Sequence, residues 1–326
     1  MSEQPRARWS PIRVIGLAVS AVSLIAVVWW AARQPAPSFP SSPAELWALA
    51  GAVAVYAVAT ALRSERWRAL LRHGSAPASR LDSYALTLVG YMGNNVLPLR
   101  AGDVMRVYLM APRARTTMRT VIGTLIAERL LDVVVLLALF VLLAYGVLRG
   151  IDTPNETALG VVAAAVLVGV IVAAIALPLA RRTGPGRRAI DYVRPLAAST
   201  RDLRGRHGAA MVGVTVAIWL VEAACYLLVG RSVALDMSLI QSLYLIAVAG
   251  VFLLIPSGPG YAGTLDAAVL FGVRAIGGTG SEAVSYLLML RFVLLVPITA
   301  AGLAALVMRY GGPDAWRSAQ AEAART

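Results

Sequence analysis

The chain has 326 residues, 59% hydrophobic and 14% charged, with a mean hydropathy of +0.72, a composition that excludes an ordinary soluble globular protein and indicates an integral membrane protein. All 30 basic residues are arginine, which excludes a lysine Schiff base and a phosphate-binding-loop lysine. The net charge of +13 lies in short segments between apolar runs, so anionic lipid head groups explain it better than nucleic acid does.

Runs of about 20 mostly apolar residues are long enough to cross a bilayer as α-helices. We therefore predict an all-α integral membrane protein with about six transmembrane helices. In chain order these lie near residues 14–32, 44–62, 120–148, 158–180, 209–230 and 282–308. Directly after the second of them, residues 64–72 carry Trp and Leu on one side and Arg elsewhere, which predicts an amphipathic helix on the cytoplasmic surface.

Two further apolar stretches, residues 84–112 and 239–273, are each interrupted in the middle, over residues 93–103 and 254–266. The helix-breaking residues that we expect to act as hinges there are Pro98, Gly102, Pro256, Gly258, Pro259, Gly260 and Gly263. Non-helical backbone at membrane depth is tolerated only where protein or a watery cavity satisfies its amides. Corresponding broken segments in two halves of a chain point to the binding site of a transporter.

Charge indicates whether these two stretches cross the membrane or return to the face they entered. If both are re-entrant hairpins, 24 arginines lie in cytoplasmic segments, against Arg33, Arg149, Arg231 and Arg274 outside. Because cytoplasmic loops are rich in arginine, we predict two re-entrant hairpins and place both termini in the cytoplasm. Three crossings lie between the hairpins, so the hairpins enter from opposite faces, as in an inverted repeat.

This topology makes residues 1–326 a single polytopic membrane domain. The first half-repeat covers about 44–148 and the second about 209–308, and each contains one hairpin. We expect a basic cytoplasmic loop at 181–208 and a short C-terminal tail at 309–326.

Ionisable residues lie deep inside three of the predicted crossings, at 120–148, 209–230 and 282–308. Arg129 and Arg291 are each nine residues into their helices, about 13 Å, which places both near the midplane. One interpretation is internal ion pairing, for example Arg129 with Asp132 and Arg291 with Glu222. The other is that at least one arginine binds an anionic head group, because a guanidinium offers a fork of donors to phosphate. The two interpretations can coexist.

In the first hairpin, asparagine side chains and a glycine turn that precedes a helix could present hydrogen-bond donors to an anion. The candidate substrate-binding residues are Arg129, Arg291, Asn94, Asn95, Arg100, Asp103 and Arg106. The acids that we expect to form ion pairs or to bind a coupling proton are Glu128, Asp132, Glu222 and Asp266. We expect no catalytic residue, no cofactor and no metal, since the lone Cys225 and two loop histidines offer no ligand cluster.

As an ordered set, these motifs resemble the lysylphosphatidylglycerol synthase transmembrane-region family, the flippase-like membrane half of the multiple peptide resistance factor. The resemblance covers about residues 45–308. It rests on Trp67 and the leucines after it, Gly93-Asn94 through Pro98, Gly102-Asp103 with Arg106, Glu128-Arg129 with Asp132, and Pro256 through Gly263 with Asp266. At 103 and 266 the family more often has Glu. The aminoacyl-transferring domain of the bifunctional members is missing, so aminoacyl-lipid synthesis is not expected.

The resemblance and the motifs together predict a translocase of the bacterial cytoplasmic membrane. It would move an anionic phospholipid or a polyprenyl-phosphate-linked lipid between the two hairpins. An alternative is a non-transporting accessory of an envelope glycosyltransferase or lipid-modifying enzyme, and a homodimer partner is also open. A third possibility is a membrane enzyme acting on a lipid phosphate with Glu128 or Asp132 as base. It is the weakest, because Lys, a histidine cluster and metal ligands are lacking.

Overall fold

The computed structural model describes Val22, Ile25 and residues 28–74, 76–97, 100–143, 205–252 and 258–312. Within these ranges all regular structure is helical, which confirms the predicted all-α class. The predicted crossing at 158–180, most of the one at 14–32, the hinge residues Pro98 and Pro256, and most of the basic loop and the tail lie outside the described residues.

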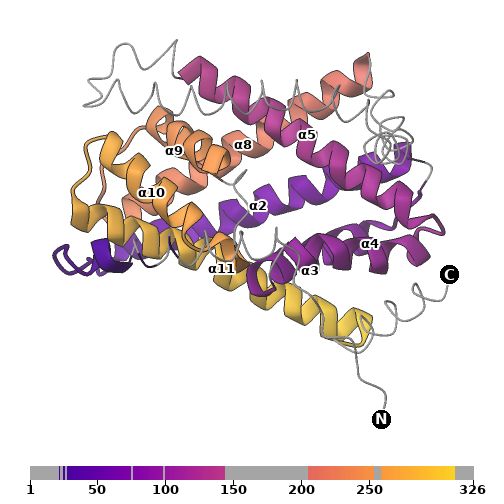
Figure 1. The fold of residues 1–326 in the computed structure, drawn as a ribbon, viewed down its shortest axis with the longest axis horizontal. Helices are drawn as coiled ribbons and strands as arrows, with labels where there is room; N and C mark the ends of the chain where they lie inside the picture. The colour runs from indigo at the N-terminus through magenta and orange to yellow at the C-terminus, as the bar shows by residue number, and fades with distance from the viewer. Residues whose placement is uncertain are drawn as a thin grey trace.

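Four long helices form the frame of the molecule (Figure 1). They are α2 (Pro43–His73), α5 (Met118–Leu142), α8 (Arg206–Ser232) and α11 (Gly280–Tyr310). Each coincides with a predicted crossing. Helices α2, α8 and α11 are long and apolar enough to span a membrane. Helix α5 has 25 residues, about 37 Å at the α-helical rise, but it carries the charged residues 128, 129 and 132 in its middle.

Side-chain caps fix where two of these helices begin. Ser42 and Glu45 form a capping box at the start of α2, and Thr279 and Glu282 form another at the start of α11. Each box satisfies backbone N–H groups that have no partner within the helix. Neither glycine nor proline interrupts α2 between Gly51 and Gly74, so the helix continues through His73.

Both interrupted stretches are broken helices. In the first, α3 (Arg80–Val96) ends and α4 (Ala101–Arg113) begins after Arg100, whose backbone is left-handed with φ 54°. In the second, α9 (Leu239–Phe252) is followed by a 3₁₀ turn, η4 (Pro259–Tyr261), and then by α10 (Thr264–Ala275). Helix α3 packs against α4 and α9 against α10, so each broken segment folds back on itself as a helical hairpin.

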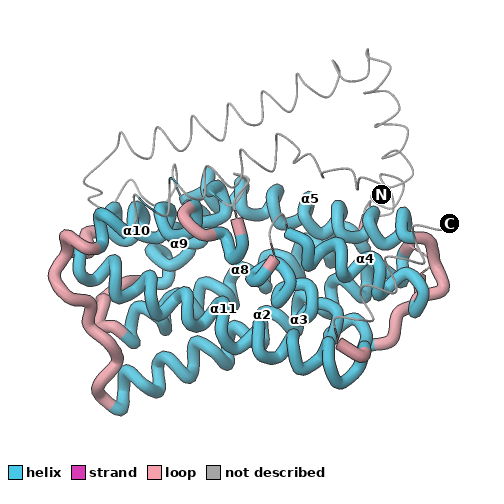
Figure 2. Tube along the Cα trace, turned by 60° about the horizontal axis from the view of Figure 1, so that its bottom comes forward, coloured by secondary structure: helices cyan, strands magenta, loops and turns pink. Residues whose placement is uncertain are grey.

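The helix contacts follow the same scheme in the two halves of the chain. Helix α3, the first helix of the first hairpin, packs against α11. Helix α9, the first helix of the second hairpin, packs against α5. Between them α2 and α8 lie side by side, each also touching the first helix of its own hairpin. The hairpins occupy opposite ends of the long axis, with α9 and α10 at one end and α3 and α4 at the other (Figures 1 and 2).

The first hairpin closes through a contact between glycines. A Cβ atom on Gly102 would lie 1.8 Å from the Gly90 carbonyl oxygen, and one on Gly93 would lie 2.6 Å from the Gly102 Cα. Backbone therefore meets backbone where α3 crosses α4, and only glycine fits. This approach brings the end of α3 and the start of α4, with their polar side chains, to one place.

We predict that Gly102→Ala opens this hairpin and lowers stability by about 3 kcal/mol, at the upper end of overpacking costs, because the new methyl group meets backbone that cannot move aside. Melting temperature in detergent would measure the effect. Gly213→Ala on α8 is the matched control, since nothing lies within 4 Å of its Cβ position. That change should be neutral or stabilising by up to about 1 kcal/mol. Equal melting temperatures for the two variants would contradict the glycine contact.

Candidate functional site

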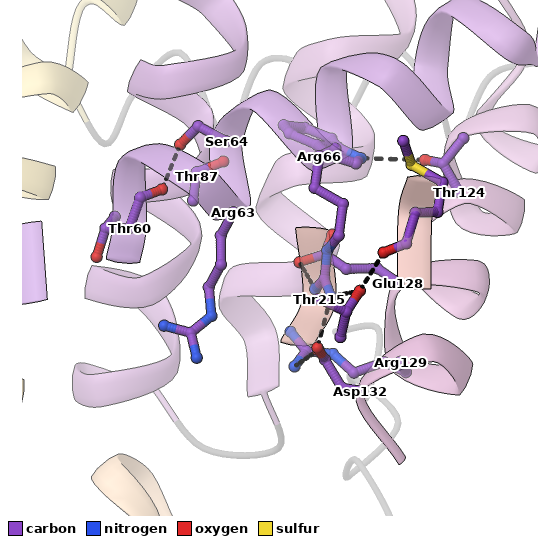
Figure 3. Close-up of polar contacts among 12 residues, drawn as sticks. Thr60, Arg63, Ser64, Arg66, Thr87, Thr124, Glu128, Arg129, Asp132 and Thr215 are labelled. Carbon is purple, nitrogen blue, oxygen red and sulfur yellow. Dashed lines mark hydrogen bonds and ion pairs between the residues drawn. The ribbon is translucent and has the colours of Figure 1, made fainter. Parts of the chain in front are cut away.

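Six charged side chains of alternating sign form a closed ring where α2, α4 and α5 meet. Its members, in order around the ring, are Arg66, Asp132, Arg129, Asp103, Arg106 and Glu128. Three arginines balance three carboxylates, so the ring as a whole is neutral. Figure 3 shows Arg66 reaching from α2 to the acids of α5. We call this set the charge ring.

The inner part of the charge ring is almost completely buried. Arg66 Nη1 donates to Asp132 Oδ1 at 2.7 Å, and Arg106 Nη2 donates to Glu128 Oε2 at 3.0 Å. Glu128 also lies 3.7 Å from Arg66, and it is 1% exposed. The Arg106 guanidinium carbon lies 3.9 Å from the centre of the Trp67 ring, a cation–π contact. Buried charges need such partners, because taking them out of water is expensive.

The outer part of the charge ring is looser and more exposed. Arg129 approaches Asp103 no closer than 3.7 Å and Asp132 no closer than 3.8 Å, and its side chain is 37% exposed. Asp103 lies 3.7 Å from Arg106. The predicted pairing of Arg129 with Asp132 is therefore present, but only as a long contact. Arg66 and Arg106 each donate a short hydrogen bond to a ring carboxylate, although two nitrogens of each are buried without a hydrogen-bond partner, whereas Arg129 contacts its acids only at 3.7 Å and longer.

A separate ion pair joins α2 to α8. An Arg63 Nη atom donates to a Glu222 carboxylate oxygen, and the Arg63 guanidinium also lies 5.1 Å from the centre of the Trp219 ring. Both partners are buried. Arg63 lies ten residues before the last residue of α2, and Glu222 ten residues before the last residue of α8. The pair thus joins the two long helices that lie between the hairpins.

The second break is held by Arg291. Its Nε donates to Asp266 Oδ1 at 2.6 Å, and its Nη1 donates to the Gly260 carbonyl at 2.6 Å. The other carboxylate oxygen of Asp266 accepts from the Gly263 N–H at 2.8 Å. Arg291 therefore satisfies backbone carbonyl groups that the broken helix cannot satisfy itself. The predicted pairing of Arg291 with Glu222 is wrong. Arg291 pairs instead with Asp266 of the second hairpin, and Glu222 pairs with Arg63.

Side-chain amides hold the first break in a similar way. Asn94 Oδ1 accepts from the Asp103 N–H at 3.3 Å and its Nδ2 donates to Asp103 Oδ1 at 3.4 Å, which ties the end of α3 to the start of α4. Asn95 Nδ2 donates to Thr299 Oγ1 on α11 at 3.0 Å. The two breaks also meet, since a Cβ on Gly260 would lie 3.5 Å from the Asn95 carbonyl oxygen.

A partly open cavity of about 300 Å³ lies where the breaks meet. Its charged lining residues are Arg63, Arg100, Arg129, Asp132 and Glu222. Polar and aromatic side chains complete much of the wall: Asn94, Asn95, Tyr56, Tyr91, Trp219, Tyr226 and Tyr261. Helices α2, α5, α8 and α11 and both breaks therefore all contribute to one chamber. Among the described residues no group of three or more His, Cys, Asp or Glu side chains could hold a metal ion.

The structure divides the predicted site residues into two groups. Asn94, Asn95, Arg100, Arg129, Asp132, Glu222 and Gly260 line the cavity, whereas Arg106, Glu128, Asp266 and Arg291 do not. Arg106 is fully buried in the charge ring, and Arg291 is occupied by the second break. Asp103 does not line the cavity, but it contacts both the cavity-lining Arg129 and the buried Arg106.

The prediction that residues 64–72 lie on the membrane surface is wrong, and Arg63 and Arg66, which the charge count includes among the 24 cytoplasmic arginines, do not face solvent. Both arginines and Trp67 are buried inside the helical bundle, because α2 continues for eleven residues beyond the predicted end of its crossing at residue 62. The absence of any Gly or Pro before Gly74 was the signal in the sequence. The sequence could not show that Glu222 on α8 and Asp132 on α5 form ion pairs with these arginines.

Two substitutions should separate structural charges from the exposed one. Glu128→Gln leaves two buried guanidinium groups short of a partner, and we expect it to cost about 3–5 kcal/mol. Arg129→Gln removes only long, partly exposed contacts and should cost about 1 kcal/mol or less. Denaturation in increasing fractions of sodium dodecyl sulfate would measure both. A larger loss for Arg129→Gln than for Glu128→Gln would show that Arg129 is part of the structural core.

Helical frame, broken hairpins and polar chamber together define a polytopic helical membrane protein with a site between paired helix breaks. The chain belongs to the family described as the lysylphosphatidylglycerol synthase TM region, whose model matches residues 13–302. This confirms the resemblance in the sequence. A UPF0104 membrane protein of Methanothermobacter thermautotrophicus is similar, 22% identical over 284 residues that cover 78% of this chain and 83% of the relative. No solved structure matches the chain significantly.

Proposed function

We propose that this protein is a lipid translocase that passes an anionic head group through the chamber between the two hairpins. One observation carries the proposal: both helix breaks meet at a cavity lined by the loosely held Arg129. At about 300 Å³ the cavity is at the small end of ligand pockets, about 300–1,000 Å³, so it suits a head group whose tails stay in the surrounding lipid.

Arg129 is the residue that we propose binds the phosphate. A guanidinium presents a planar fork of donors that matches phosphate oxygens. The inner charge ring supports this role, because the buried pairs of Arg66 and Arg106 fix the carboxylates beside which Arg129 lies. An arriving phosphate then competes only with contacts of 3.7 Å and longer.

Arg291 is the counterpart of Arg129 in the other half. Each is the twelfth residue of its long helix, and each contacts the aspartate in the first turn of the preceding short helix, Asp103 or Asp266. We propose that the halves form an inverted repeat whose hairpins enter from opposite faces. The tight Asp266 pair and the loose Asp103 pair then represent a closed and an open half-site, which exchange as the lipid passes.

Liposome reconstitution tests this function. We expect Arg129→Gln to slow translocation of a fluorescent anionic phospholipid at least tenfold, whereas Arg129→Lys, which keeps the charge, should retain more activity. Arg231→Gln, at the exposed end of α8, is the matched control and should translocate at the full rate. The reporter would be dithionite quenching of the outer leaflet.

Full-rate translocation by folded Arg129→Gln protein would overturn this role of the cavity. No translocation by the unchanged protein, together with capture of an envelope glycosyltransferase, would favour the accessory function instead.

A further inference from the structure

The cavity wall carries hydrogen-bonding groups that the protein leaves unused. The hydroxyls of Tyr56, Tyr91 and Tyr226 and the indole N–H of Trp219 all belong to residues that line it. Within the described part of the chain none of the three tyrosine hydroxyls has a hydrogen-bond partner. The Trp219 nitrogen has none either, but it is buried out of reach of a ligand. The three hydroxyls belong to residues that line the cavity, and each can both donate and accept, so a ligand with hydroxyl groups would find partners there.

The carboxylates of the same wall are already occupied. Glu222 is in its ion pair with Arg63, and Asp132 Oδ1 accepts from Arg66 Nη1 at 2.7 Å. An ammonium group entering the cavity would have to share a carboxylate that an arginine already holds, and it would lie beside Arg63 and Arg129, which repel it. Arg129, which its acids hold only at 3.7 Å and longer, is the cation of this wall that the phosphate of a phosphodiester would contact.

Resting on the proposed translocase function, we propose that this cavity selects phosphodiester lipids with one negative charge and a neutral, hydroxyl-rich head group, such as a polyol or a sugar. Arg129 takes the phosphate, and the tyrosines take the hydroxyls. Lipids with an amine head group, including aminoacylated ones, bind less well. A site that hydrogen-bonds a substrate hydroxyl disfavours an analogue without it, because the site's own polar groups then stay unpaired.

Competition among lipids of identical acyl chains tests this selectivity. The probes are phosphatidylinositol and phosphatidylglycerol, phosphatidylmethanol as a monoanion without hydroxyls, and phosphatidylethanolamine and lysylphosphatidylglycerol as amines. Native mass spectrometry of the purified full chain would measure which lipid is retained. We expect the two hydroxylated monoanions to be retained roughly fivefold over phosphatidylmethanol, the effect of about one net hydrogen bond, and more strongly still over the amines.

Conservative variants identify the groups responsible. The double variant Tyr91→Phe with Tyr226→Phe should bring the ratio of phosphatidylinositol to phosphatidylmethanol close to one while leaving phosphatidylmethanol retention unchanged. Tyr286→Phe is the control, because its hydroxyl donates to the Tyr226 carbonyl at 3.1 Å and the residue does not line the cavity. It should keep the ratio of the unchanged protein. Arg129→Gln should weaken all the monoanions alike.

Two results would overturn the proposed selectivity: equal retention of phosphatidylinositol and phosphatidylmethanol, or an unchanged ratio in the double tyrosine variant. Better retention of an amine lipid would overturn it as well. Translocation of anionic lipids without head-group preference would contradict the proposed selectivity but agree with the translocase function. Selective retention of hydroxylated monoanions without translocation in liposomes would support the selectivity and contradict the translocase function.

Discussion

The charge ring is the constraint on which the rest of the first half depends. Its inner members Arg66, Arg106 and Glu128 are buried almost completely, so each is stable only while its partners are in place. Because the ring draws on α2, α4 and α5, these helices must approach one another closely enough for ion pairs to form. The glycine contact that closes the first hairpin allows this, since it carries α4 back toward α3 and places Arg106 over Trp67.

The second half keeps the same helices but not the same charges. Counted from the helix starts, Glu128 and Asp132 correspond to Leu290 and Leu294, and Arg106 corresponds to Val269. Apolar side chains thus occupy the equivalent places, and Asp266 with Arg291 is the polar pair that the second hairpin retains. The two breaks are therefore stabilised differently. Buried ion pairs support one, and a single arginine bound to backbone carbonyls supports the other.

Much of the architecture could be predicted from the sequence, because hydrophobic length and helix-breaking residues act locally. The four long helices and both breaks follow from such signals. The partners of the charges could not be predicted, since they depend on which helices become neighbours. Arg106 and Asp103 looked equally suited to bind substrate. Burial makes Arg106 part of a structural ion pair, whereas Asp103 stays partly exposed beside Arg129. The aromatic wall was missed for the same reason.

The pair of Arg63 and Glu222 has a consequence for the symmetry of the chain. In the inverted repeat that we propose, α2 and α8 are equivalent helices that meet at the two-fold axis, and this pair lies in their contact, each residue ten before the end of its helix. A symmetric dimer built from one half alone would bring two arginines or two glutamates together there, and like charges buried side by side repel. Opposite charges at that point are open only to a chain whose halves have different sequences. The contact at the centre of the bundle thus requires both halves, and neither can be replaced by a second copy of the other.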